Sequence, residues 1–170
     1  LGLSGFFLCF GGGAAAFAAP SVEEMAGQML LVGFKGQEPE ECGAILRDIQ
    51  TRHLGGVILF KRDARNAKLP RNIRDAAQVK RLIAALRGAS AGHPLFVAVD
   101  QEGGKVARFQ PGDGFPAYPS AAELGRGTPD ATRRTALGMG RMLRELGVNL
   151  NFAPVLDVNV YPASPAIGRL

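Results

Sequence analysis

The sequence predicts an α/β fold with a parallel β-sheet, and three largely apolar runs carry this prediction. They span residues 55–60, 95–99 and 148–156, and each leads directly into a charged side chain. Strands that are buried on both faces read as apolar runs of this kind. Helical patterns separate the runs, and strand–helix–strand alternation implies parallel pairing with right-handed crossovers. A doubly wound sheet and a barrel both satisfy this pattern. No G-x-G-x-x-G motif follows any run, so a dinucleotide-binding sheet has no support.

Length and composition indicate a globular protein with a substantial core. The chain has 170 residues, of which 46% are hydrophobic and 21% charged, and its net charge is +5. We interpret this charge as a solvated basic surface, because no basic stretch is interleaved with aromatic residues as a nucleic-acid stacking surface requires. No nucleic-acid partner is therefore expected.

The first 19 residues have the features of a secretory signal. They carry no charge, and an apolar stretch is followed by small residues and an A-x-A pattern at residues 16–18. A membrane anchor is the alternative, which five glycines and a length at the bottom of the spanning range disfavour. The sequence thus predicts two regions, a signal-like segment at 1–19 and a domain at 20–170. It also predicts a secreted or periplasmic protein that is not stably inserted in a membrane after signal removal.

Cysteine and histidine usage predicts neither a disulfide nor a metal site. Removal of the signal leaves Cys42 as the single cysteine, and no zinc-ligand spacing is present. His53 and His93 are isolated from each other and from cysteine along the chain. We therefore expect no metal and no cofactor.

Local signals place the helices. Ser21 to Glu24 form a capping box, which predicts a helix with Met29 and Leu30 on its apolar face that Gly33 and Gly36 end. A second helix is expected after Pro39. It should close near 52–53, with His53 as a helix-end residue rather than a catalyst.

Later helices are predicted by spacing and caps. Apolar spacing predicts a helix over 76–86, and Thr128 followed by Pro129 predicts a helix start. Gly147 is the expected stop of that last helix. Residues 61–74 carry six basic side chains and one Asp, and we expect a solvated loop there. In a parallel barrel this loop would leave the carboxyl end of a strand and rim a pocket.

The candidate site lies where the run at 95–99 ends. Asp100 follows this run directly, and Glu102 comes two residues later. A carboxylate at the carboxyl edge of a parallel sheet is placed for ligand binding, although Asp100 could instead only shape the turn. Arg108 would bring a forked donor to the same pocket. Asp157 ends the run at 148–156, and we expect it to hold neighbouring loops rather than to act in catalysis.

Five segments together resemble a known family. They are GGVILFKRD, AVDQEGGKVARF, FPAYPSAAELG, NLNFAPVLDVN and AIGRL, and they occur in the family's order. From about residue 22 to 170 the chain resembles the amino-terminal barrel of glycoside hydrolase family 3, most closely its bacterial β-N-acetylhexosaminidase branch. The resemblance implies the N-terminal part of a (β/α)8 TIM-type barrel, incomplete here, because a whole barrel needs roughly 250 residues.

The resemblance also implies a retaining mechanism with an Asp nucleophile and a His acid/base assisted by an Asp. Asp100 matches a position that binds the hydroxyls of the terminal sugar, and Arg108 matches a second sugar-binding position. Asp157 does not match the nucleophile, so the pairing of Asp100 with Asp157 as two catalytic carboxylates is not supported. The K-H-F-P-G-H-G segment of the family is absent from these 170 residues, and His53 and His93 do not match it. Arg169 lacks the context of a further sugar-binding arginine and receives no role.

We therefore expect a glycosidase that acts on a carbohydrate substrate containing terminal N-acetylhexosamine. We assign no catalytic residue within the chain and expect the polypeptide alone to be inactive and poorly stable, because an open barrel leaves an unpaired strand edge. Two alternatives remain open at this point. One is a β-glucosidase or exo-glucanase of the same family, and the other is a non-catalytic sugar-binding protein.

Overall fold

Four parallel strands form the sheet at the centre of the structure. The computed structural model describes residues 19–90 and 92–161, and its strands are β1 (Leu31–Gly33), β2 (Gly56–Ile58), β3 (Phe96–Val99) and β4 (Leu150–Asn151). Every neighbouring pair is parallel, and the spatial order β1-β2-β3-β4 follows the chain. The predicted α/β class is confirmed. Strands in sequential order are typical of a barrel, whereas a doubly wound sheet reverses its order at a switch point.

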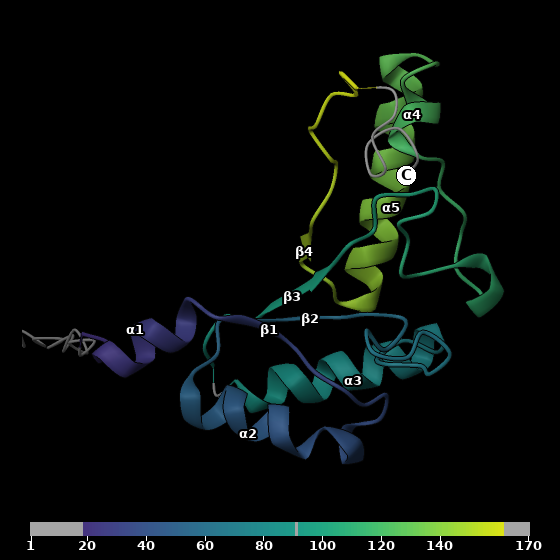
Figure 1. Ribbon diagram of the computed structural model, residues 1–170. Helices are drawn as coiled ribbons and strands as arrows, with labels where there is room; N and C mark the ends of the chain where they lie inside the picture. Colours follow the sequence, from purple (N-terminus) through teal and green to yellow (C-terminus); the bar gives the residue numbers. More distant parts are fainter. Residues whose placement is uncertain (1–18, 91, 162–170) are drawn as a thin grey trace, which may run out of the picture.

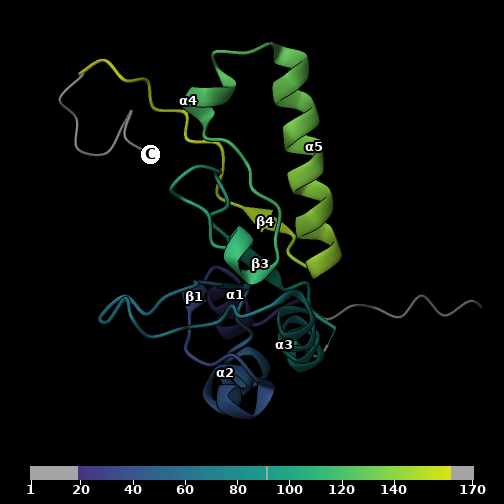
Figure 2. The same ribbon diagram turned by 90° about the vertical axis from the view of Figure 1, so that its right-hand side faces the viewer.

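Helices connect successive strands and pack beside one another. The α-helices are α1 (Val22–Gln28), α2 (Gly43–Arg52), α3 (Ala76–Ala89), α4 (Ala121–Leu124) and α5 (Pro129–Leu146), and the 3₁₀ helices are η1 (Pro39–Cys42) and η2 (Pro111–Asp113). Helix α3 lies between α2 and α5 and contacts both. Figure 2 shows these three helices in succession along the outside of the strands, while Figure 1 shows α1 at the amino end of the sheet.

The caps that the sequence predicted are present. Ser21 accepts a hydrogen bond from the Glu24 amide and completes a capping box at α1. Thr128 caps α5 with Pro129 at its first turn, and Gly147 ends this helix at a φ of 94°. His53 is the C-cap of α2, so its interpretation as a helix-end residue is confirmed.

The core lies between the sheet and α2, α3 and α5. Val57, Leu59, Val97 and Val99 have no exposed surface, and Leu82 of α3 is equally buried. The remaining members include Ile45 and Ile49 of α2, Val79, Ile83 and Leu86 of α3, and Met139, Leu143 and Leu146 of α5. Burial of both the strands and one face of each helix explains why the sequence shows apolar runs and helical spacing side by side.

The first helix is shorter than predicted, and a strand follows it. Helix α1 ends at Gln28 with Met29 as its C-cap, so the prediction that Gly33 and Gly36 end the helix was wrong. Met29 is 85% exposed and Leu30 is 52% exposed, whereas the next residues form β1. The three-residue strand is defined by parallel pairing with β2, a long-range contact that a local apolar run does not reveal.

A further strand is shorter than predicted, and the loop at 61–74 is partly buried. The run at 148–156 was expected to be a long strand, but β4 covers only Leu150–Asn151. The segment 61–74 is a loop that is mostly exposed, as expected, but Asp63, Asn72 and Ile73 within it are buried. Asn72 bonds to the loops that follow β1 and β2. The signal-like segment and the AIGRL ending lie outside the described residues. Within residues 19–90 and 92–161, no helix has both the length and the apolar character needed to cross a membrane.

Candidate functional site

The structure brings the two predicted sugar-binding residues into direct contact. Asp100 follows β3 at the carboxyl edge of the sheet, and Arg108 returns to it from the following loop. A terminal nitrogen of Arg108 lies 2.8 Å from Oδ2 of Asp100, and the two side chains are 29% and 22% exposed. Both therefore remain accessible to a small polar ligand while holding each other in place.

Two side-chain amides, those of Gln101 and Asn151, fix the loop that carries Arg108. Oε1 of Gln101 accepts from the backbone amides of Arg108 (2.9 Å) and Phe109 (3.0 Å), and its Nε2 donates to the Phe109 carbonyl (3.1 Å). The Asn151 side chain in β4 bonds to both the amide and the carbonyl of Gln101. Gln101 has no exposed surface, so this network anchors the loop from inside the sheet edge.

Arg108 faces a cavity shared with the loop after β2. The cavity has a volume of about 400 Å³ and is lined by Phe60, Lys61, Arg71, Gln110 and neighbouring residues. The guanidinium carbon of Arg108 lies 5.7 Å from the centre of the Phe60 ring. Nε of Arg108 is buried and has no hydrogen-bond partner among the described residues. Buried donors without a partner are rare in proteins, so this one marks Arg108, which lines the cavity, as unusual.

Ion pairs connect the loops at the carboxyl edge of the sheet. Lys61 bonds to Asp113 and, at 2.8 Å, to Gln110, which ties the β2 loop to the β3 loop. Lys35 lies 2.7 Å from Asp63. The Lys35 ammonium and the Arg65 amide lower the pKa of Asp63 to about 2, so this carboxylate stays ionised at neutral pH.

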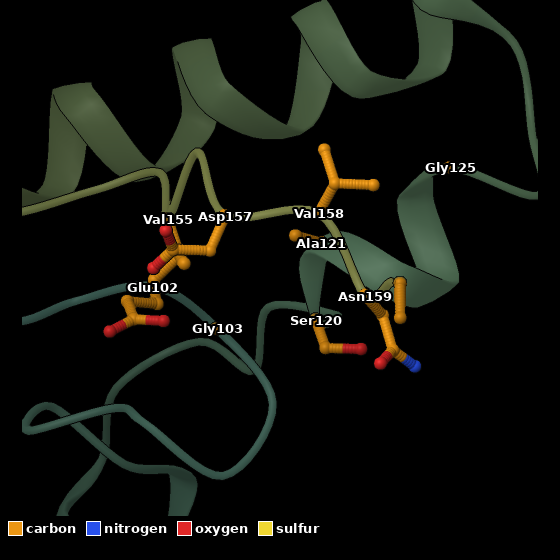
Figure 3. Close-up of a pocket in the computed structure, with 10 residues that line it drawn as sticks. Glu102, Gly103, Ser120, Ala121, Gly125, Val155, Asp157, Val158 and Asn159 are labelled. Atoms are coloured by element: carbon orange, nitrogen blue, oxygen red, sulfur yellow. The ribbon is translucent and has the colours of Figure 1, made fainter. Parts of the chain in front are cut away.

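A second pocket at this edge brings Glu102 and Asp157 together. It has a volume of about 550 Å³, and Figure 3 shows both carboxylates at the same end of it. Burial, followed by the negative charge of Asp100, raises the pKa of Glu102. Asp157 is exposed and lines this pocket, so the structure places it at the carboxyl edge but apart from the Asp100–Arg108 pair.

Sequence reasoning missed the residues that position the site. Gln101 and Asn151 carry no charge, Gln101 stands between the carboxylates Asp100 and Glu102, and Asn151 stands between two apolar residues, so no local pattern marked them. The one feature that could have marked them is a polar side-chain amide within or directly after a strand. Such an amide needs hydrogen-bond partners when it is buried. Sequence reasoning also treated His53 and His93 as isolated from each other. That interpretation is wrong in space, because their rings lie 5.7 Å apart at the opposite end of the sheet.

Comparison with known proteins identifies the family. The family model described as glycosyl hydrolase family 3 N terminal domain matches residues 21–169. The chain is similar to beta-hexosaminidase A of Pseudoalteromonas piscicida, with 31% identity over 169 residues that cover 86% of this chain and 27% of the relative. It is also similar to beta-hexosaminidase of Thiobacillus denitrificans, with 37% identity over 136 residues that cover 76% and 34% of the two chains.

A solved structure has a similar fold. The chain resembles a glycoside hydrolase family 3 beta-N-acetylglucosaminidase from a Paenibacillus species, with a TM-score of 0.77 and 35% identity. The match covers 88% of this chain and 27% of that one, so the chain spans about a third or less of the length of these relatives. The likeness agrees with the N-terminal part of a barrel. On this fold and these matches, the chain belongs to glycosyl hydrolase family 3 and corresponds to its N-terminal domain.

Proposed function

We propose that this chain provides the sugar-binding edge of a β-N-acetylhexosaminidase that removes terminal N-acetylhexosamine from a glycan, as in cell-wall recycling. Family membership supports a glycosidase, and relatives named beta-hexosaminidase support the N-acetylated sugar. The single observation that carries the proposal is the Asp100–Arg108 pair at the carboxyl edge of a parallel sheet, where barrel enzymes keep their sites.

The pair has the chemistry that a sugar ring requires. One oxygen of Asp100 is held by Arg108, and the carboxylate retains acceptor capacity for two adjacent hydroxyls. The Arg108 guanidinium is partly exposed and has further N–H groups that can donate to a ring oxygen. Donor and acceptor side by side match a hydroxyl, which both donates and accepts. No metal or cofactor enters this proposal.

The bond-breaking groups are assigned to polypeptide other than residues 1–170. The resemblance implies a retaining reaction in which an Asp nucleophile forms a glycosyl-enzyme intermediate and a His acts as acid and base. The K-H-F-P-G-H-G segment that would carry this His is absent from the sequence. We therefore assign Asp100 and Arg108 to substrate binding and assign no catalytic residue within this chain.

The test compares substrates and variants in a full-length enzyme that contains this chain. We expect hydrolysis of 4-nitrophenyl N-acetyl-β-glucosaminide and a much lower rate with the plain β-glucoside. Asp100→Asn and Arg108→Lys should each lower kcat/KM about 100-fold, because a site built for hydrogen bonds loses its matched partners. Asp48→Asn, on the outer helix α2, is the matched control and should leave kcat/KM unchanged.

Three results would contradict the proposal. Preference for the plain glucoside would indicate a β-glucosidase, and sugar binding without hydrolysis by the full-length protein would indicate a non-catalytic binding protein. Hydrolysis by the 170-residue polypeptide alone would show that the assignment of the catalytic groups is wrong.

We also propose that residues 1–19 direct secretion or export to the periplasm, which the uncharged stretch and the A-x-A pattern support. Cell fractionation followed by mass spectrometry of the protein's amino terminus tests this. A mature end near Pro20 in the exported fraction is expected, whereas an uncleaved cytoplasmic or membrane-bound product would contradict it.

A further inference from the structure

Three metal-ligating side chains meet at the amino end of the sheet, opposite the Asp100–Arg108 pair. They are Glu24 of α1, His53 at the end of α2 and His93 in the turn before β3. Their candidate ligand atoms all lie within 4.8 Å of one another. Two of the three are partly buried, and they come from segments that are 29 and 40 residues apart along the chain.

Helix α1 is fixed close enough to place Glu24 in this group. Gly27 allows the close approach, because a Cβ at that position would lie 1.9 Å from the Arg52 carbonyl oxygen. The Gln28 side chain donates to the His53 carbonyl at 2.8 Å, and the Gly27 carbonyl accepts from the Gly55 amide at 3.0 Å. The capping box orients Glu24, because its Oε2 accepts from the Ser21 amide at 2.7 Å. A carboxylate has acceptor capacity for this bond and for a metal ion as well.

The backbone also holds both histidines. His53 has a left-handed conformation (φ 54°, ψ 40°), which ends α2. The His93 amide donates to the Ser90 carbonyl at 2.9 Å and fixes the turn before β3. The two rings meet edge to face, with an interplanar angle of 75°.

We propose that Glu24, His53 and His93 bind one Zn²⁺ ion that links α1 to the ends of α2 and α3. Two imidazoles and one carboxylate are a zinc-type donor set, and three protein ligands leave the fourth tetrahedral position for water. Imidazole donors do not suit Mg²⁺ or Ca²⁺, which prefer oxygen. Ligands about 2.1 Å from a tetrahedral ion lie about 3.4 Å from one another, so the side chains need to close by about 1.4 Å at most.

The ion would have a structural role distinct from sugar binding. It joins three segments that lie far apart in the sequence, so binding should stabilise the folded chain over the unfolded one. Cys42 is buried, and burial together with the neighbouring Glu41 and Glu40 carboxylates raises the pKa of its thiol to about 11. It is therefore not a competing ligand at neutral pH.

The experiment is calorimetric titration of the untagged 170-residue chain with ZnCl₂, followed by thermal unfolding with and without the metal. We expect one Zn²⁺ per chain, a raised Tm, and no response to MgCl₂ or CaCl₂. Three variants remove one ligand each while keeping its structural role. Glu24→Gln keeps the capping box, and His53→Asn keeps the left-handed C-cap. His93→Gln leaves its backbone hydrogen bond in place.

Each variant should bind Zn²⁺ at least about tenfold more weakly than the parent chain. Glu23→Gln, on the same helix but outside the cluster, is the control and should bind normally. Circular dichroism of each metal-free variant confirms that it is folded. No binding to the parent chain, or affinity unchanged in His53→Asn and His93→Gln, would overturn the proposal.

Discussion

The two ends of the sheet both gather polar side chains, but different parts of the structure hold them. At the carboxyl end, the buried side-chain amide of Gln101 and the half-buried side-chain amide of Asn151 position the loop that carries Arg108. At the amino end, helix termini and backbone hydrogen bonds position Glu24, His53 and His93. The carboxyl end therefore depends on particular buried side chains, whereas the amino end depends on close approach of the backbone.

The largest effect is expected from removal of the buried amide at the carboxyl end. Gln101→Ala leaves two backbone amides and one carbonyl without their partner, and it should lower the free energy of unfolding by about 3 kcal/mol. Urea unfolding measures this. Gln50→Ala, on the exposed face of α2, is the control and should change stability by no more than about 0.5 kcal/mol. Equal effects of the two substitutions would show that the network does not hold the loop.

At the amino end, the corresponding test is a substitution that adds a methyl group where α1 approaches the end of α2 most closely. Gly27→Ala forces a Cβ against the Arg52 carbonyl and should destabilise the chain by about 2 kcal/mol. Gly88→Ala, within α3 and with nothing within 4 Å of its Cβ, should instead stabilise it by about 0.5–1 kcal/mol. Thermal unfolding of both variants gives the comparison. The same sign for both would contradict the close docking of α1.

Acid unfolding tests the ion pair beside the carboxyl-edge cavity. The pKa of Asp63 is lowered to about 2, so this group stabilises the fold above its unfolded pKa of about 3.9. That contribution should be lost as pH falls from about 4 to about 2. Urea midpoints measured at several pH values should fall more steeply for the parent than for Asp63→Asn. Parallel pH profiles would show that Asp63 is not held by Lys35.

The smallest expected effect is on the rate at which Cys42 is alkylated. Because the pKa of Cys42 is raised to about 11 and the residue is buried, iodoacetamide at neutral pH should modify it slowly in the folded chain. Peptide mass spectrometry follows Cys42 separately from Cys9. Labelling in urea provides the fast reference, and equal rates in both conditions would show that Cys42 is accessible.

The sequence predicted those structural features that depend on residues close together in the chain. The Ser21 and Thr128 caps, the Gly147 stop and the apolar spacing of 76–86 were confirmed because each depends on neighbouring residues. The β1 strand escaped prediction because pairing with residues 56–58 defines it. The histidine pair escaped for the same reason, since forty residues separate its members.

The site was predictable only in part. Asp100 and Arg108 were found from a charge at a strand end and from the family resemblance, and their contact was then observed. Their role in sugar binding stays a prediction. Gln101 was not singled out, because its role in holding the loop depends on hydrogen bonds with residues 108 and 109 and with residue 151 on the neighbouring strand. Long-range hydrogen bonds of this kind leave no periodic pattern in a sequence.

The most direct test of the central claim is a crystal structure of the full-length enzyme soaked with N-acetylglucosamine. We expect adjacent ring hydroxyls to donate to the Asp100 carboxylate and Arg108 to donate to an oxygen of the same ring. A sugar bound elsewhere in the barrel, with the Asp100–Arg108 pair untouched, would contradict it.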